Sequence, residues 1–229
     1  MEIKSISEVK AKAGNFIMLY SKSKVGKTTA LGTLEGKTLI IDTDEGLISL
    51  DGKNNIDFLT VNESTGNVIK EIKEALDLVE KNIDKYDNIC LDTLTALSKM
   101  YIDIFLSQTK DGRQAYGQLN TALYPIMGRL ERFARQQGKN VIVTAQAEVT
   151  IDQEEKETIA PSIDGKTFLQ KVVLPRFDGI IALEIDQLGK RKFITKPVGK
   201  WFAGIRDAKG VLQAKEEADF KLLFQKIKG

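Results

Sequence analysis

A glycine, a lysine and two threonines, Gly26 to Thr29, lie near the end of the stretch FIMLYSKSKVGKTTAL at residues 16–31. Their order is that of a phosphate-binding loop, in which backbone N–H groups at the start of a helix surround a polyphosphate. In such a loop Lys27 reaches the β- and γ-phosphates, and the Thr28 hydroxyl is a ligand of Mg²⁺. The sequence therefore predicts a site for ATP and Mg²⁺, with a cradle formed by Ser23, Lys24, Val25, Gly26, Lys27, Thr28 and Thr29.

The loop departs from the usual pattern G-x-x-x-x-G-K-[ST], because Ser21 stands where the first glycine belongs. If the backbone needs a positive φ at Ser21 or Lys24, the side chain there costs about 1 kcal/mol. Lys22 and Lys24 are additional cations in the same turn. They either compensate charge on the γ-phosphate or are solvated on a surface turn.

Carboxylates follow two later apolar runs. Asp92 ends the run NICLD at residues 88–92, where it is expected to hold the magnesium shell together with Thr28. The run LIIDTDEGL ends with Asp42, Asp44 and Glu45. We predict Asp44 or Glu45 as the general base that polarises the attacking water, and Asp42 as a structural residue. The alternative for these acids is a turn or a helix cap.

Gln146 follows the apolar run at residues 140–145. Ligands of open α/β sheets bind beyond the carboxyl ends of the strands, which is where this glutamine is expected. From there it can hydrogen-bond a γ-phosphate and signal its loss to a loop over residues 147–170. The alternative is a surface amide with no catalytic role.

The elements that must position these side chains are short apolar runs alternating with helix-period segments. The runs lie at residues 15–20, 38–42, 57–61, 88–92, 140–145 and 179–185, and helical periodicity covers residues 68–79 and 119–134. This alternation predicts an α/β fold with a mainly parallel sheet flanked by helices. We expect one domain over residues 1–229, with an N-terminal extension at 1–14 and an antiparallel β-extension plus a final helix at 186–229.

Composition narrows the chemistry. The chain has 229 residues, of which 42% are hydrophobic and 29% charged, which is typical of a globular protein. It has no histidine and one cysteine, Cys90, so histidine triads, thiolate metal clusters and internal disulfides are excluded. Without a long uncharged apolar run, we expect a cytoplasmic protein that does not bind membranes. The net charge of +2 means that nucleic acid would have to bind local cationic patches.

The order G-K-T-T, D-T-D-E, C-L-D-T and T-A-Q resembles that of RecA-type P-loop ATPases, from about Phe16 to about Arg206. The chain is more closely similar to small phage-encoded ATPases of recombination and single-strand annealing. The resemblance implies a RecA-like core and a DNA-dependent ATPase that acts on single-stranded DNA in the host cytoplasm. It also implies a homo-oligomer, a single-strand DNA-binding protein as a further partner, and a role for Gln146 in coupling the nucleotide to DNA.

Two alternatives remain open. Lys22 to Thr29, KSKVGKTT, is similar to the K-G-G-V-G-K-T-T loop of ParA and MinD ATPases, which implies a nucleotide-switched dimer with Lys22 as a signature lysine. The other alternative is a catalytically degenerate P-loop protein that only binds nucleic acid or partners.

Cations and aromatic residues are interleaved between residues 190 and 209, as expected for a surface that binds single strands. The candidate contacts there are Lys190, Arg191, Lys192, Lys200 and Arg206, with Phe193, Trp201 and Phe202 as stacking candidates. Alternatively, one of the cations reaches the γ-phosphate of a neighbouring subunit, or the segment is a solvated hairpin. A competing contact loop is predicted at residues 107–118, where Arg113 lies. The loop after Gln146 is acidic in its first half and offers Lys166 in its second.

Overall fold

The structure is a computed structural model that describes residues 14–62, 67–151 and 154–228. All of the predicted N-terminal extension except Gly14 lies outside the described residues. Asp152, in the acidic loop predicted after Gln146, also lies outside them.

The core is a parallel sheet in the order β7-β1-β5-β4-β2-β3. The strands are β1 (Phe16–Ser21), β2 (Thr38–Asp42), β3 (Ile56–Thr60), β4 (Asn88–Asp92), β5 (Asn140–Ile151) and β7 (Gly179–Ile185). Because β5 separates β1 from β4, the phosphate loop and Asp92 face each other across the end of a third strand. The prediction of a mainly parallel α/β fold is confirmed.

Antiparallel strands extend the sheet. They are β6 (Glu157–Ser162), which pairs with β5, and β8 (Arg191–Ile194), β9 (Gly204–Ile205) and β10 (Lys215–Glu217) beyond or beside β7. The last three form the antiparallel extension predicted for the C-terminal segment.

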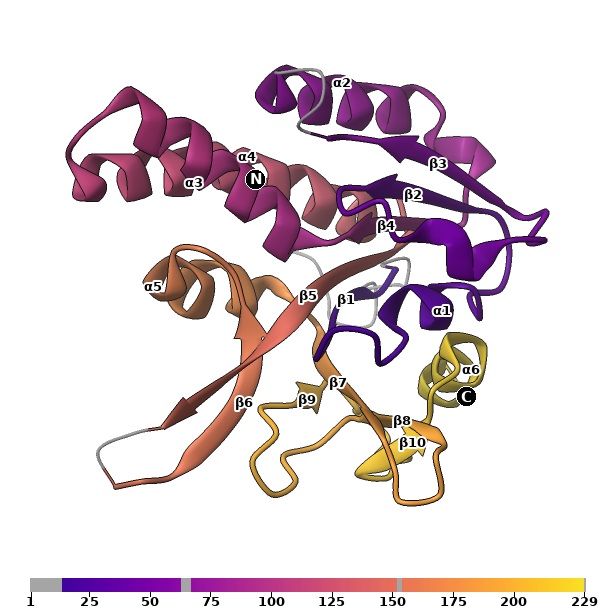
Figure 1. Cartoon of the computed structure of the whole chain (residues 1–229). Helices are drawn as coiled ribbons and strands as arrows, with labels where there is room; N and C mark the ends of the chain where they lie inside the picture. The colour runs from indigo at the N-terminus through magenta and orange to yellow at the C-terminus, as the bar shows by residue number, and fades with distance from the viewer. Residues whose placement is uncertain (1–13, 63–66, 152–153, 229) are drawn as a thin grey trace, which may run out of the picture.

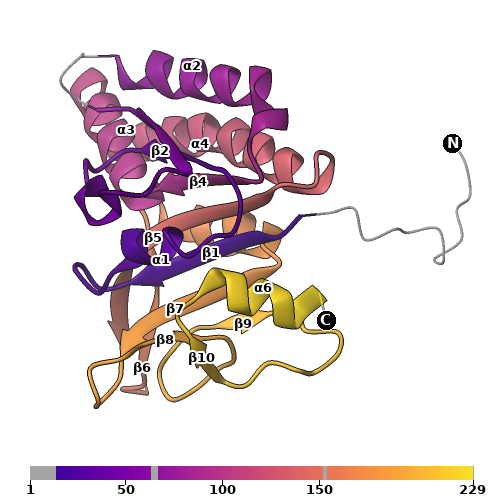
Figure 2. The same cartoon turned by 90° about the vertical axis from the view of Figure 1, so that its right-hand side faces the viewer.

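Helices cover both faces of the sheet (Figures 1 and 2). One face carries α2 (Val68–Lys81), α3 (Leu94–Gln108), α4 (Gly112–Arg135) and α5 (Lys166–Phe168), and the other carries α1 (Lys27–Leu31) and α6 (Phe220–Lys228). Short 3-10 or π turns occupy Leu47–Leu50, Ile83–Lys85, Leu169–Val173 and Leu174–Arg176. Within the described ranges, no helix combines the length and the apolar character needed to cross a bilayer.

Strand β1 shows why the strands of this sheet are continuously apolar in sequence. Phe16, Met18 and Tyr20 pack into the core beneath α2 to α5, while Ile17 and Leu19 pack into the core beneath α1 and α6. A strand covered on both faces buries every side chain, so hydrophobic residues do not alternate with polar ones. Both cores therefore hold the start of the phosphate loop in a fixed position.

The contact loop predicted at residues 107–118 is wrong. Helix α4 already begins at Gly112, and the Asp111 carboxylate accepts a hydrogen bond from the Arg113 N–H at 2.9 Å. Aspartate is a preferred N-cap residue because its side chain pairs an otherwise unbonded N–H group of the first turn. Arg113 and Tyr116 consequently project from a helix.

The loop predicted at residues 147–170 is also wrong in its first half. Strand β5 continues to Ile151 and returns as β6, with Gln146 opposite Ser162 and Ile151 opposite Glu157. The two strands form a hairpin that extends beyond the sheet (Figure 1). The β-branched residues Val149, Thr150 and Ile151 favour the continuation of the strand. Gln146 therefore lies within a strand, level with the end of β1.

Candidate nucleotide-binding site

In the turn between β1 and α1, Lys24 is the residue with a side chain that adopts a strained, left-handed backbone conformation. Gly26 has a φ of +109° and Lys24 a φ of +63°, whereas Ser21 is a buried strand residue whose hydroxyl donates to the Lys22 carbonyl at 2.8 Å. The cost of about 1 kcal/mol expected for a missing glycine thus belongs to Lys24 and not to Ser21. Lys22, Ser23 and Lys24 are exposed at the tip of the turn, and Val25 and Gly26 are half-buried.

Lys27 is the first residue of α1, and only 8% of it is exposed. Burial lowers the pKa of its ammonium group, and the charges of Asp92 and Asp44 oppose that shift. The Lys27 ammonium group has already lost most of its hydration shell on folding. Binding an anion therefore requires little further desolvation of this group. Thr29 lies one position beyond Thr28 in the same short helix and is half-buried.

Asp92 is fully buried at the end of β4 and receives two hydroxyl groups. Thr28 Oγ1 donates to Asp92 Oδ2 at 2.7 Å, and Thr144 Oγ1 donates to Asp92 Oδ1. Sequence reasoning missed Thr144. It lies in β5, the strand between β1 and β4, two residues before Gln146, and only the strand order brings its hydroxyl to Asp92.

The oxygen atoms of Thr28 and Asp92 are the donors that a magnesium ion prefers. Among the described residues, no group of three or more histidine, cysteine, aspartate or glutamate side chains could hold a metal ion by itself. The donor set fits an ion that takes most of its ligands from water and from the phosphates of a nucleotide. Thr28 would be its direct protein ligand, and Asp92 would orient its shell.

Asp42 has the environment of a structural residue. It is 3% exposed, accepts a hydrogen bond from the Asp44 N–H at 3.3 Å, and lies opposite Asp92 in the pairing of β2 with β4. Burial raises the pKa of its carboxyl group. The neighbouring Thr43 hydroxyl donates to the Thr93 carbonyl at 2.7 Å and accepts from the Thr93 N–H at 2.8 Å, which locks the two strand ends together.

Asp44 and Glu45 have different surroundings. Partial burial, together with the charges of Asp92 and Asp42, raises the pKa of Asp44 to about 6, and the charge of Lys27 opposes this shift. Both residues are exposed, and Glu45 has a φ of +55° and accepts a hydrogen bond from Asn62 Nδ2 at 3.0 Å. Of the two candidates for the base, Asp44 is therefore the one whose pKa is shifted by the charges of Lys27 and Asp92.

Gln146 is exposed and pairs with Ser21, the residue just before the phosphate loop. Its N–H donates to Thr95 Oγ1 at 2.9 Å, and Thr95 Oγ1 donates in turn to the Ser162 carbonyl at 2.6 Å. Gln146 is thereby connected to α3, the helix that starts just after Asp92.

The basic candidates of the C-terminal segment are dispersed. Arg191 lies against the phosphate loop, where its Nε donates to the Val25 carbonyl at 2.9 Å. Lys200 forms an ion pair with Glu157 at the end of the hairpin, and Arg206 pairs with Asp178 at 2.9 Å. Asp178 accepts from the Phe16 N–H at the start of β1, so Arg206 lies at the opposite edge of the sheet from Lys27.

The expected interleaving of these cations with stacking aromatic rings is largely absent from this segment. Phe193 is fully buried among core residues of β8, because its side chain faces α6. Trp201 is half-buried and donates from Nε1 to Glu184 Oε2 at 3.1 Å. Phe202 is 45% exposed, Lys190 is exposed in the β7–β8 turn, and Lys192 is half-buried. Phe193 cannot stack on a base, which corrects the sequence-based expectation.

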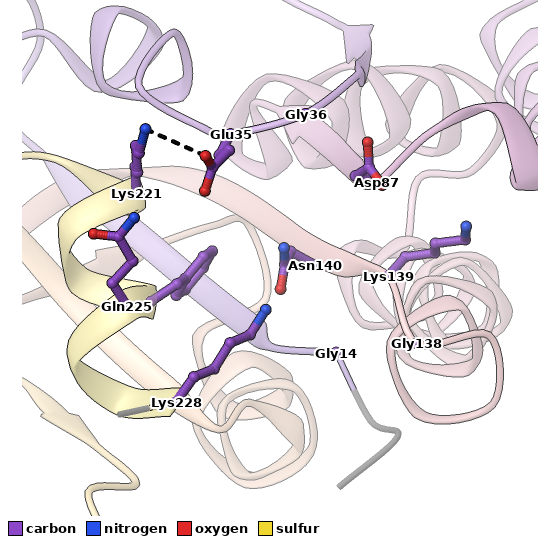
Figure 3. Close-up of a pocket in the computed structure, with 11 residues that line it drawn as sticks. Gly14, Glu35, Gly36, Asp87, Gly138, Lys139, Asn140, Lys221, Gln225 and Lys228 are labelled. Carbon is purple, nitrogen blue, oxygen red and sulfur yellow. Dashed lines mark ion pairs between the residues drawn. The ribbon is translucent and has the colours of Figure 1, made fainter.

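A hollow of 470 Å³ lies at the amino edge of the sheet, away from these residues (Figure 3). Its lining comes from Gly14 before β1, Asp87 before β4, Asn140 at the start of β5, and α6, where Lys221 pairs with Glu35 at 3.2 Å. Ligands of parallel α/β sheets bind at the carboxyl edge, so this hollow is not the candidate site.

Comparison with known proteins gives one positive result. A family model described as an AAA domain matches residues 13–206, a span that includes the phosphate loop, Asp92 and the β5–β6 hairpin. No curated protein matches the chain.

Proposed function

This chain belongs to the AAA domain family, and we propose that it is a magnesium-dependent ATPase that acts on single-stranded DNA in recombination or strand annealing. The AAA domain is ATPase-like, with a phosphate-binding loop that binds a nucleotide. The observation that carries the ATPase proposal is the hydrogen bond of 2.7 Å between Thr28 and Asp92, beside the buried Lys27. This bond brings the phosphate-binding loop and the acid at the end of β4 together, and a nucleotide with its metal ion requires both.

The proposed reaction is the in-line attack of water on the γ-phosphate of ATP. Lys27 neutralises charge on the phosphates, and the turn at residues 22–26 surrounds them with backbone N–H groups. Bound Mg²⁺ would supply further neutralisation of the developing charge. The Asp44 carboxylate accepts the proton of the attacking water, for which a pKa of about 6 is suitable at neutral pH.

Two substitutions test this assignment. Lys27→Ala is expected to abolish ATP binding in calorimetry, because the buried cation is lost. Asp44→Asn is expected to retain binding and to lose about a hundredfold or more in turnover, since the proton acceptor is removed. Glu45→Gln is the matched control and should keep wild-type turnover. Equal losses in the two acid variants would contradict Asp44 as the base, and unchanged binding in Lys27→Ala would contradict the nucleotide site.

The proposal of DNA binding is supported by a groove of 400 Å³ between α4 and the segment that follows β6. Tyr116 and Asn120 line one side, and Gly165 and Lys166 line the other. Tyr116 is 42% exposed, and the exposed Arg113 lies one turn before it on α4. Exposed aromatic rings beside cations bind single strands by stacking and by neutralising phosphates.

This groove is physically connected to the nucleotide site. Helix α3 begins just after Asp92, and its first turns carry Thr95 and Ser98. Thr95 contacts Gln146 and Ser162, and Ser98 Oγ accepts from the Asp164 N–H at 3.1 Å. A displacement of Asp92 would thus move the first turns of α3, and with them Gly165 and Lys166 in the groove.

DNA dependence is tested by measuring ATP turnover with and without single-stranded DNA. We expect stimulation of the wild-type protein, and in Tyr116→Ala a loss of DNA affinity of about 1–3 kcal/mol, the usual value of one stacked base. Tyr124→Ala is the matched control, because Tyr124 is an exposed tyrosine two turns further along the same helix. Turnover that is indifferent to DNA would contradict the proposal, while the ATPase assignment would stand.

A further inference from the structure

Arg191 is held against the phosphate loop of its own chain. Its Nε donates to the Val25 carbonyl at 2.9 Å, and a Cβ atom placed on Gly26 would lie 2.5 Å from that Nε. Gly26 is therefore needed for two reasons, its φ of +109° and the close approach of the guanidinium group. Within the described residues, the two terminal nitrogens of Arg191 have no hydrogen-bond partner.

A groove of 400 Å³ opens beside this contact. One wall is α1 at Thr29, with Thr33 in the turn that follows the helix. Another is Lys190 in the β7–β8 turn with Arg191 at the start of β8, and the third is the segment before α6, where Ala218 lies between Glu217 and Asp219. Its size falls within the range of small-ligand sites, about 300–1,000 Å³.

The geometry of α1 relates this groove to the two ends of a polyphosphate. Successive residues of a helix point about 100° apart, so the Thr29 side chain points to a different side of α1 from the Thr28 side chain, which meets Asp92. Thr29 lines the groove, and so does Thr33 in the turn after the helix. When the metal-bound β- and γ-phosphates lie at Thr28 and Asp92, the α-phosphate and the nucleoside that it carries would lie on the side of Thr29.

On the basis of the proposed function, we propose that this groove receives the ribose and base of the nucleotide, and that Arg191 is a specificity-determining residue that contacts the nucleotide in the same chain. The Nε bond to Val25 fixes the plane of the guanidinium group, and its two terminal nitrogens face the ligand as donors. A planar guanidinium group both donates hydrogen bonds to phosphate oxygens and stacks on an aromatic base. Arg191 is consequently not a finger residue for a neighbouring subunit.

The test compares two ligands in calorimetry with Mg²⁺, namely ATP and inorganic tripolyphosphate, which has no nucleoside. Ala218→Phe fills the groove and should weaken ATP binding about tenfold or more, a change of about 1.4 kcal/mol, while tripolyphosphate affinity stays within about twofold. Arg191→Ala should weaken ATP binding by a similar factor and tripolyphosphate binding by less. Arg191→Lys should recover only part of the loss, because a lysine cannot hold Val25 and the nucleotide together.

Retained tripolyphosphate binding shows that each variant is folded. If Ala218→Phe binds neither ligand, that variant has lost its fold and the result with Arg191→Ala decides the test, because Arg191 is exposed and its replacement leaves the core unchanged. ATP binding at the wild-type level in both variants, or equal loss of both ligands in Arg191→Ala, would overturn the inference and leave the ATPase proposal intact. Failure of the wild-type protein to bind either ligand would instead remove the proposed function, and the inference with it.

Discussion

Asp44 illustrates how a single residue can be held in an unfavourable state at a candidate functional site. Its carboxyl group lies near two other carboxylates, Asp42 and Asp92, and its pKa of about 6 is well above the ordinary value of 3.8. Burial is the larger cause of this shift, and the two negative charges add to it. The folded protein therefore disfavours the ionised form of Asp44, which is the form that the proposed role of general base requires. Active sites often carry such a cost in stability.

This cost predicts that Asp44→Asn stabilises the protein in the absence of nucleotide and Mg²⁺. Because the folded pKa is raised, the penalty is fully present above pH 6 and disappears as the pH falls from 6 towards 4. After discounting for the solvent-exposed part of the side chain, the gain at pH 7.5 is about 1 kcal/mol, or about 3 °C in melting temperature. Thermal denaturation at pH 7.5 and pH 4 measures it.

Asp84→Asn is the control for this experiment, since Asp84 is also an exposed aspartate but lies on a different edge of the sheet from the three acids. Its melting temperature should follow that of the wild-type protein at both pH values. A stabilisation of Asp44→Asn that persists unchanged at pH 4 would show that burial of charge is not its cause.

At the scale of elements, the β5–β6 hairpin depends on a contact with β1. The Tyr20 side chain is fully buried, and its hydroxyl lies 2.9 Å from both the Ile159 and the Phe202 carbonyl oxygens. Backbone bonds join the same segments, because the Phe202 N–H donates to the Ile159 carbonyl at 2.9 Å. One strand of the core thus fixes both the hairpin and the chain after β8.

Removal of this hydroxyl predicts a measurable loss of stability. Tyr20→Phe should lower the free energy of unfolding by about 1–2 kcal/mol, because the Phe202 carbonyl oxygen loses the hydroxyl donor and the Ile159 carbonyl oxygen keeps only the Phe202 N–H. Urea denaturation should show a lower midpoint with an unchanged slope. Tyr101→Phe is the control, since Tyr101 is equally buried and its hydroxyl forms no hydrogen bond within the described part of the chain. Equal losses in the two variants would mean that the Tyr20 bonds contribute nothing.

At the scale of the whole molecule, the candidate nucleotide site, the groove beside Tyr116 and the β5–β6 hairpin lie towards the carboxyl edge of the sheet, whereas Arg206 and the hollow of Figure 3 lie at the amino edge. We propose that the chain assembles into a homo-oligomer, and that a single-strand DNA-binding protein is a further partner. Arg206 and Lys200 are satisfied by Asp178 and Glu157 in the same chain, so a role across a subunit interface would require one of these pairs to open.

Sedimentation velocity tests the assembly. We expect the sedimentation coefficient to increase when ATP and single-stranded DNA are added together, because nucleotide-dependent association brings several chains onto one strand. Lys27→Ala is the control and should remain at the nucleotide-free value. A wild-type protein that sediments as a monomer with both ligands present would contradict the oligomer. Turnover and DNA binding measured on the same sample would then describe a monomeric enzyme.

The sequence by itself determined the features that are encoded locally. Runs of buried apolar residues gave β2, β4 and β7 their observed bounds, and the G-K-T-T order placed Lys27 at the start of a helix. These predictions succeeded because hydrophobic burial on both faces and the backbone needs of a tight turn act on consecutive residues. Two local signals also account for the departures from the predicted loops, namely the N-cap aspartate Asp111 and the β-branched residues 149–151.

Only the tertiary structure decided which distant groups meet. Thr144 reaches Asp92 because β5 lies between β1 and β4, and Arg191 reaches Val25 because β8 folds back beside β7 over the phosphate loop. Phe193 was expected on a surface and is buried because its strand places it beneath α6. The physical reason is the same in each case. Strand order and register set these contacts, and they follow from packing the whole chain, which no local pattern of residues contains.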